Sequence, residues 1–341
     1  MTRGAVLAAL IATLAGPWPT PAVAWPVLSG PYFGQKPPGM RAEMFAPGIV
    51  SSEHHDDGPP AFSPDGRECF WRVMGQRDSA STIPGLMFWS REENGRWTEP
   101  RLAPFSNPYG AGIPCLQPDG QRLYCRFRTP RRPRSGDRHE AEWQSSFVDR
   151  TPSGWSEPRP FSPPIGSHRL TFFSVGADGS LLCVLEDSAA TSAGTAVYRI
   201  RRDGDGFVAP ESMGVVPTGA EQIVAMPTFS PDGRTFVFTA RSEEGLILKA
   251  SFRQQDGTWT MPRPLGDDIN APPQTKFAGF SPDGRYLFVV SNRPASNANP
   301  PKLWKSDAFN GPQREPLCDV YWVDAKAVEA LRPADAKAPS R

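Results

Sequence analysis

The feature that most constrains the fold of this chain is a short turn that recurs five times between apolar runs. Three copies read Phe-Ser-Pro-Asp-Gly, and the five are centred on Asp65, Asp119, Asp178, Asp232 and Asp283, at intervals of 51 to 59 residues. Proline presets the φ angle of a type I turn, and glycine adopts the left-handed conformation that ends it. Each copy therefore predicts a β-hairpin, and repetition at this period predicts a repeat architecture.

A second motif, an aromatic residue three places before a proline, follows four of the turns. Its copies begin at Trp97, Trp155, Phe207 and Trp259. The missing copy precedes the first turn instead, where Phe45 stands one place out of register before Pro47. A closed ring of blades needs this arrangement, because the first segment then pairs with the last blade and removes the open sheet edge.

Together the two motifs predict an all-β fold, a five-bladed β-propeller of four-stranded blades. An N-terminal strand, from residues near 45–51, is expected to close the ring on the blade that ends at Val323. A six-bladed ring would need a further degenerate repeat, and no stretch of the chain is long enough to supply one. We expect the recurring aromatic residues to pack between blades and the recurring aspartates to cap their own turns.

The Phe-Ser-Pro-Asp-Gly turns resemble those of the WD-repeat-like propeller family found in the C-terminal domain of TolB and in many bacterial envelope proteins. The resemblance covers residues 42–325, with Ala177 in place of proline in the third copy and Leu116-Gln117 in place of Phe-Ser in the second. It implies a propeller fold but no single activity, since related blades serve binding proteins, lyases and peptidase gates. It also implies protein partners near the outer membrane, although the partner-binding N-terminal domain of TolB has no counterpart here.

The first 24 residues read as a secretory signal peptide. Arg3 precedes the apolar stretch 5–15, and Ala22-Val23-Ala24 forms a small-x-small cleavage site before Trp25. The apolar run is too short to span a membrane, so we expect no transmembrane segment in the mature chain and a periplasmic or secreted location. An N-terminal extension (25–41) would then precede the propeller (42–325), and a short helix with a disordered tail from residue 333 would occupy 326–341.

Composition limits the partners and the covalent chemistry. Lys and Arg total 37 against 36 Asp and Glu, which argues against nucleic-acid binding. Of the five cysteines, Cys115 and Cys125 lie on opposite arms of one hairpin and could form a disulfide in an oxidising compartment. We favour free, buried thiols, because cross-strand disulfide geometry is demanding. No phosphate loop, dinucleotide fingerprint or hydrolase motif is found, so no cofactor is expected, and we expect a monomer.

A candidate binding site follows from the predicted topology. The residues ten places before the five aspartates are His55, Tyr109, His168, Gln222 and Pro273, with Glu221 and Lys276 close by. In a propeller these positions meet on the face opposite the turns, at the mouth of the central channel, which is the default place for a site. His54, His55, Asp57 and His168 could bind a metal ion there, but polar loop clusters of this kind are more often simply solvated.

An arginine run in the second blade is a second candidate. It comprises Arg126, Arg128, Arg131, Arg132 and Arg134, and we place it in the loop between two strands. Guanidinium groups in such a loop could bind an anionic glycan or an acidic protein segment. The alternative, which we favour, is a mobile solvated loop.

These observations favour a non-enzymatic function. We expect an exported binding or scaffold module that recognises an envelope protein or glycan at the channel mouth. The alternative is a polysaccharide-active propeller enzyme, a lyase or hydrolase, using His55 and His168 as acid, base or ligands. The paired carboxylates that a hydrolase needs are weakly represented at this mouth.

Overall fold

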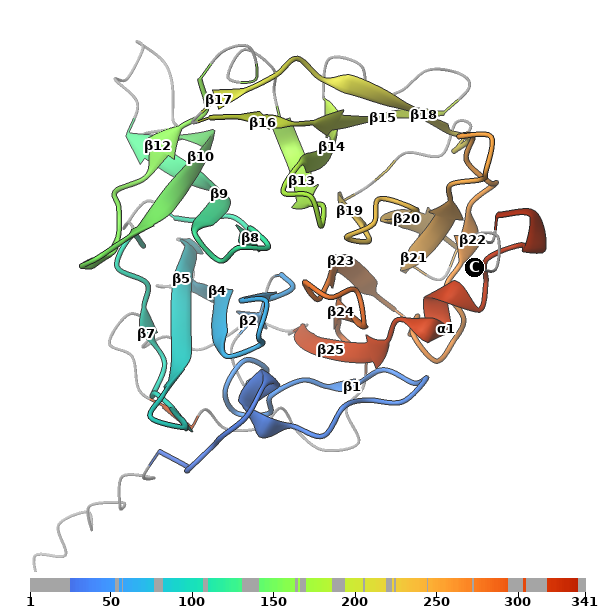
Figure 1. Ribbon diagram of the computed structural model, residues 1–341. Helices are drawn as coiled ribbons and strands as arrows, with labels where there is room; N and C mark the ends of the chain where they lie inside the picture. Colours follow the sequence, from blue (N-terminus) through green and yellow to red (C-terminus); the bar gives the residue numbers. More distant parts are fainter. Residues whose placement is uncertain are drawn as a thin grey trace, which may run out of the picture.

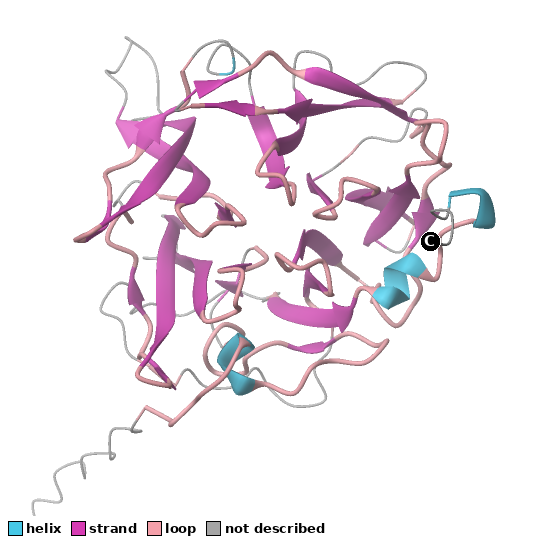
Figure 2. Cartoon of the chain, viewed as in Figure 1, coloured by secondary structure: helices cyan, strands magenta, loops and turns pink. Residues whose placement is uncertain are grey.

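Five antiparallel sheets surround a central axis in the computed structural model, and the chain forms the expected five-bladed β-propeller (Figure 1). Strands dominate the fold, and the few helical segments lie at its outer edge (Figure 2). The structure describes residues 25–52, 55–56, 58–76, 82–106, 110–130, 141–162, 165, 170–185, 194–204, 206–218, 223, 225–243, 245–271, 273–293, 303–304 and 318–336. No helix in this part of the chain is long and apolar enough to cross a membrane.

The first three blades run from the axis outwards in chain order. The first holds β2 (His55–Asp56), β3 (Ala61–Phe62), β4 (Glu68–Gln76), β5 (Thr82–Glu93), β6 (Arg96–Trp97) and β7 (Arg101–Leu102). The second holds β8 (Cys115–Leu116), β9 (Arg122–Pro130), β10 (Ala141–Thr151), β11 (Gly154–Trp155) and β12 (Arg159–Pro160). The third holds β13 (Leu170–Val175), β14 (Leu181–Leu185), β15 (Thr195–Ile200) and β18 (Glu211–Val216), beside a ribbon of β16 (Arg202–Asp203) and β17 (Gly206–Phe207).

The last two blades show how the ring closes. The fourth holds β19 (Ala225–Phe229), β20 (Thr235–Ser242), β21 (Gly245–Phe252) and β22 (Arg263–Pro264). The fifth holds β23 (Thr275–Phe280), β24 (Tyr286–Ser291) and β25 (Asp319–Asp324), and its outermost strand is β1 (Glu43–Met44) from the other end of the chain. The five-bladed prediction, including closure by an N-terminal strand, is confirmed.

The recurring turns are held by their own side chains. In the turn of Asp65, the Ser63 hydroxyl donates to the aspartate Oδ1 at 2.6 Å, and the same oxygen accepts the Arg67 N–H at 3.1 Å. The turns of Asp232 and Asp283 repeat both bonds. The glycines that follow these three aspartates have φ between +67° and +71°, where a side chain would be strained. The turns are therefore structural, and we call the face that carries them the turn face and the opposite face the loop face.

Each blade packs on the next through one cluster of buried apolar side chains, and the five clusters close a ring. The aromatic residues of the second motif belong to these clusters, as expected. Trp97, Phe207 and Trp259 are buried, whereas Trp155 remains half-buried at the junction of the first two blades. Inter-blade packing thus explains the periodicity of the motif, with one partial exception.

The seam between the fifth and first blades combines main-chain pairing with aromatic packing. Glu43 and Met44 pair with β25, the Phe45 N–H donates to the Val320 carbonyl at 2.8 Å, and the Ser51 hydroxyl donates to the same carbonyl at 2.8 Å. The Phe45 ring is fully buried, among Phe62 of the first blade and Phe288 and Trp322 of the fifth, with ring centres 5.0 to 5.7 Å apart.

The N-terminal extension is a structural part of this seam, which its sequence did not reveal. Tyr32 and Phe33, in the short 3₁₀ turn η1 (Tyr32–Gly34), both adopt positive φ. The Tyr32 ring lies 4.7 Å from Phe62 and 5.3 Å from Tyr286, so it bridges the two blades. The extension is tied further by the Trp97 indole, which donates to the Gly30 carbonyl at 2.7 Å.

The C-terminal segment carries the expected short helix, α1 (Lys326–Glu329), beside the fourth and fifth blades (Figure 1). The expectation of a disordered tail from residue 333 is wrong for its first residues. A 3₁₀ turn, η4 (Ala334–Ala336), follows the helix, and Ala336 is buried in the cluster between those blades. Packing against a neighbouring apolar surface orders this segment despite its polar composition. Residues 337–341 lie outside the described part.

All five cysteines are free thiols, so Cys115 and Cys125 are not joined. Cys115 pairs with Tyr124 across the hairpin, whereas Cys125 is one residue further along the partner strand. Burial raises the pKa of Cys115 to about 12 and raises the pKa of Cys69, Cys125 and Cys183 as well. Little reactive thiolate is therefore present at neutral pH.

We predict that the Phe45→Ala variant loses about 3–5 kcal/mol of unfolding free energy, because it leaves a cavity at the closure of the ring. Urea denaturation of the variant and the wild type measures this difference. Met261→Ala is the matched control, since Met261 is 69% exposed, and it is expected to change stability by less than about 0.5 kcal/mol. A loss at Phe45 no larger than that of the control would contradict the importance of the seam.

We also predict that a thiol reagent labels the native, unreduced protein slowly at neutral pH and labels five thiols once the chain is unfolded. The physical reason is burial, which both blocks access and disfavours the thiolate. Counting thiols photometrically in denaturant checks this. A count two lower would indicate the disulfide that the structure lacks.

Candidate functional site

The inner ends of all five blades line one narrow cavity on the axis. Its volume is about 80 Å³, and the lining segments are 59–62, 113–116, 173–175, 227–229 and 278–282, together with Pro231. The described lining residues are apolar or small, and none is Asp, Glu, Lys, Arg or His. This volume is well below that of typical small-molecule sites, so we expect a larger ligand to bind at one of the two faces.

Direct contacts between inner strands keep this cavity narrow. The Phe229 N–H donates to the Ser174 hydroxyl at 3.0 Å, and the Cys115 thiol donates to the Phe173 carbonyl at 3.3 Å. A Cβ atom at Gly279 would lie 2.8 Å from Pro59 of the neighbouring blade. Glycine is thus required where the last blade meets the first, and the channel is a packed core.

Most of the predicted channel-mouth residues cannot be placed. His54, Asp57, Tyr109, His168, Glu221 and Gln222 lie outside the described residues. His55 belongs to β2, where it pairs with Met74 of β4, and Lys276 belongs to β23, with its ammonium 5.0 Å from the centre of the Phe277 ring. Within the described ranges no three His, Cys, Asp or Glu side chains gather as metal ligands. The binding site at the channel mouth and the metal site there therefore stay predictions.

The arginine run lies partly in a strand, which corrects its placement in a loop. Arg126 and Arg128 belong to β9, while Arg131, Arg132 and Arg134 fall outside the described residues. The Arg128 N–H donates to the Gly110 carbonyl at 2.9 Å, and the Gly112 N–H donates to the Arg126 carbonyl at 2.6 Å. Gly110 and Gly112 therefore pair with the strand that carries Arg126 and Arg128.

An exposed tryptophan completes this surface. Trp143 of β10 stands opposite Arg128 in the strand register, and 41% of it is exposed. The guanidinium carbons of Arg126 and Arg128 lie 5.8 and 5.9 Å from the centre of its ring. Such cation–π contacts hold a guanidinium flat while its edge remains able to donate. Sequence reasoning missed Trp143, because only the register of β9 against β10 brings it to the arginines; we call these three residues the Trp143 patch.

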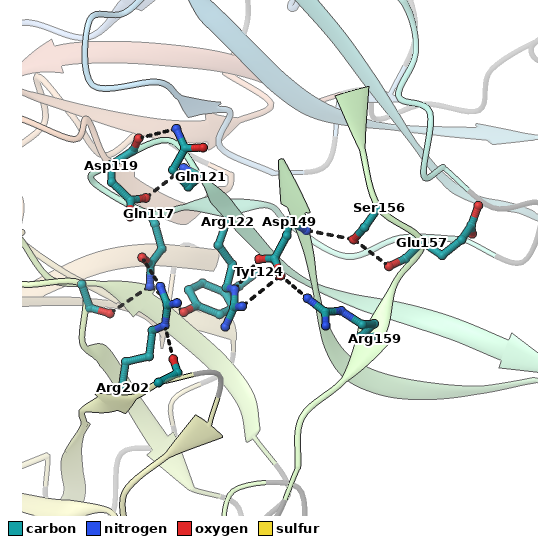
Figure 3. A network of polar contacts seen from close by, with 12 residues as sticks. Gln117, Asp119, Gln121, Arg122, Tyr124, Asp149, Ser156, Glu157, Arg159 and Arg202 are labelled. Carbon is teal, nitrogen blue, oxygen red and sulfur yellow. Dashed lines mark hydrogen bonds and ion pairs between the residues drawn. The ribbon is translucent and has the colours of Figure 1, made fainter. Parts of the chain in front are cut away.

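A polar network on the turn side joins the second and third blades (Figure 3). The Gln117 amide donates to the Tyr124 hydroxyl at 2.6 Å and to the Gly179 carbonyl at 3.2 Å. Gln117 occupies the place where the three Phe-Ser-Pro-Asp-Gly turns have serine, so this departure from the repeat supplies a bond between blades. The Arg202 guanidinium also donates to the side-chain amide oxygen of Gln117, at 3.4 Å.

The same network contains a buried arginine with a carboxylate partner. Arg122 is 2% exposed and donates to both oxygens of Asp149, at 2.5 and 2.9 Å, and Arg159 binds the same carboxylate from the other side (Figure 3). Burial alone would raise the pKa of Asp149, but the hydrogen bonds and charges of Arg122 and Arg159 outweigh it and hold that pKa below its ordinary value. We interpret this cluster as structural.

Comparison with known proteins finds solved structures that are similar only at low sequence identity. No protein-family model and no curated protein matches the chain. TolB from Acinetobacter baumannii is similar over 71% of this chain, with a TM-score of 0.42 and 13% identity; the chain spans half the length of that protein.

Two further solved structures are similar over more of the chain. An oligogalacturonate lyase from Vibrio parahaemolyticus has a TM-score of 0.41 and 12% identity over 88% of this chain and 77% of its own. A glycosyl hydrolase from Bacteroides ovatus has a TM-score of 0.42 and 8% identity over 91% of this chain and 98% of its own. At these low sequence identities, the activities of those proteins cannot be assigned to this chain.

We predict that Asp149→Asn lowers the unfolding free energy at neutral pH by about 1–3 kcal/mol, because the buried Arg122 loses its charged partner. A carboxyl with a depressed folded pKa stabilises above its unfolded pKa and loses that effect as the pH falls through the folded value. The difference between variant and wild type should therefore shrink in acid, which urea denaturation at several pH values measures. The exposed Asp203→Asn serves as control, and an Asp149 difference that is independent of pH would contradict the ion pair.

Proposed function

We propose that this protein is an exported, non-enzymatic binding module that recognises an anionic envelope glycan or protein through the loop face of its second blade. The observation that carries the proposal is the Trp143 patch, in which two arginines lie against a tryptophan that is 41% exposed. Arginine and tryptophan are the residues most often found at the energetic centres of interfaces. The remaining arginines of the run, Arg131, Arg132 and Arg134, follow closely in the sequence.

The chemistry of the patch selects an anionic partner. Guanidinium forks match carboxylates, sulfates and phosphates, and an aromatic ring behind them limits the conformational entropy lost on binding. The chain as a whole is nearly neutral, with 37 Lys and Arg against 36 Asp and Glu. Attraction to acidic partners would therefore be local to this surface rather than a property of the whole molecule.

Location and assembly form part of the same proposal. The signal-like residues 1–24 support export to the periplasm or the medium, where acidic envelope glycans and envelope proteins occur. We take the protein to act as a monomer with no cofactor. The closed ring leaves no blade without a neighbour, so folding requires no second copy.

The alternative function, a polysaccharide lyase or hydrolase, would also need its active site on the loop face. The described channel lining offers the Cys115 thiol but no carboxylate or imidazole for acid–base chemistry. A polysaccharide lyase or hydrolase would therefore have to use His55 and His168 near the mouth. If the wild-type protein turns over a glycan and the His168→Ala variant does not, the enzymatic function would replace the proposed binding function.

We predict that Trp143→Ala weakens binding of acidic envelope glycan or of the captured envelope protein by about tenfold, because the arginines lose the ring that orders them. Titration calorimetry with the purified partner measures the change. Arg128→Ala should act in the same direction, and Arg96→Ala, which removes an equal charge from an exposed site on another blade, should leave binding unchanged. Equal affinities of the Trp143 variant and the wild type would refute the role of the patch.

A further inference from the structure

A basic groove lies between the outer parts of the first two blades, away from the Trp143 patch. Its volume is about 420 Å³, and Trp89, Arg91, Arg101, Leu102, Arg150 and Trp155 form most of its wall. Figure 1 shows the outer strands of these blades, β5 with β7 and β10 with β12, side by side. The Arg150 guanidinium donates to the carbonyl of Gly120 in the turn of the second blade, so this groove opens near the turn face.

Three guanidinium groups in this groove lie on two indole rings. The guanidinium carbons of Arg91 and Arg101 are 5.2 and 4.7 Å from the centre of the Trp89 ring, and that of Arg150 is 4.4 Å from the Trp155 ring. Trp155 is the motif tryptophan that remains half-buried. Here an aromatic residue of the repeat both packs between blades and supports a charged side chain.

The charges in the groove are only partly neutralised. Arg150 pairs with Glu68, which is buried between the blades, and Arg91 pairs with Glu93 at 2.6 Å, where the two side chains are 43% and 42% exposed. Arg101 makes no ion pair with any carboxylate of the described chain. Glu68 stands opposite Arg91 in the strand register but makes its ion pair with Arg150. Arg91 and Arg101 thus share one ring, and of the two only Arg91 has a carboxylate partner in the described chain, Glu93.

In the second blade, the arginine at the position that corresponds to Arg101 has a carboxylate partner. Arg159 of β12 stands opposite Phe147, as Arg101 of β7 stands opposite Trp89, and Arg159 binds Asp149 two residues further along β10. In the first blade the residue two places beyond Trp89 is Arg91. The strand position that holds the neutralising carboxylate in one blade therefore holds a further guanidinium in the other, and the residue opposite it changes from Arg122 to Glu68.

We propose that this groove is a second binding site, which takes the carboxylate of an acidic sugar within an oligosaccharide. The planar carboxylate would supply to Arg91 and Arg101 the counter-charge that Asp149 supplies to Arg159, through charge-assisted hydrogen bonds. The site is separate from the Trp143 patch and does not depend on the function proposed for that patch.

The size and lining of the groove favour a sugar over a simple anion. Its volume is within the range of small-molecule sites and greatly exceeds that of a single carboxylate or phosphate. Leu102, which is 43% exposed, and Pro104 offer apolar surface to the C–H faces of a sugar ring, and the exposed Ser153 offers a hydroxyl. The groove thus combines positive charge with apolar and hydroxyl contacts.

The test measures binding of a short oligouronate to the full-length protein by titration calorimetry, with its carboxyl-reduced neutral counterpart and an oligoglutamate of equal charge as comparison ligands. We expect saturable binding of the oligouronate and at least about tenfold weaker binding of the other two, because one lacks the charge and the other the sugar ring. No saturable binding, or equal binding of the neutral oligomer, would overturn the proposal. Tighter binding of the oligoglutamate would overturn it in favour of an acidic protein segment.

Variants then locate the site. Arg101→Ala should weaken oligouronate binding by about tenfold, and Arg101→Lys should also weaken it, because a lysine keeps the charge but loses the planar fork. Arg91→Asp should abolish oligouronate binding, because it places a negative charge where the carboxylate of the ligand would lie. Arg96→Ala, which removes an equal charge from an exposed site outside the groove, should bind as the wild type does. Unchanged affinity in Arg101→Ala would overturn the assignment, whatever the outcome at the Trp143 patch.

Discussion

Main-chain pairing between β1 and β25 joins the two ends of the chain and holds the five blades in a ring. Every blade buries both of its faces against neighbours, so the first and last blades can complete their packing only against each other. The rings of Phe45 and Tyr32 fill that junction from segments that precede the first blade. Because the ring depends on this closure, the positions of all inter-blade surfaces, including both candidate sites, depend on it too.

Residues that recur in the blades of this protein have structural roles, and residues that depart from the repeat make contacts that the described parts of the other blades lack. The aspartates of the turns and the motif aromatics recur and serve as caps and packing. Gln117 departs from the repeat and links two blades, and Arg91 departs from the pattern that Asp149 sets in the next blade. The second departure places two guanidinium groups on the Trp89 ring, and of these Arg101 has no carboxylate partner within the described chain.

The sequence predicted the fold far better than the sites. Turn chemistry and the displaced motif at Phe45 specified five blades and a seam, because both are local signals with a fixed period. Trp143 was missed because its relation to Arg128 arises across two strands, and the arginines were assigned to a loop because a charged, proline-containing run resembles one. Ala336 was assigned to a disordered tail, since burial against another blade leaves no trace in local composition.

By itself the sequence determined the number of blades, the order of strands and the structural role of the repeated residues, since hairpins and their spacing depend on neighbours along the chain. Only the tertiary structure decided which charged side chains share a surface. Arg101 and Arg150 come from different blades, 49 residues apart, and meet because two sheets pack face to face. Contacts of that kind depend on register and packing between blades, which no local pattern in the chain encodes.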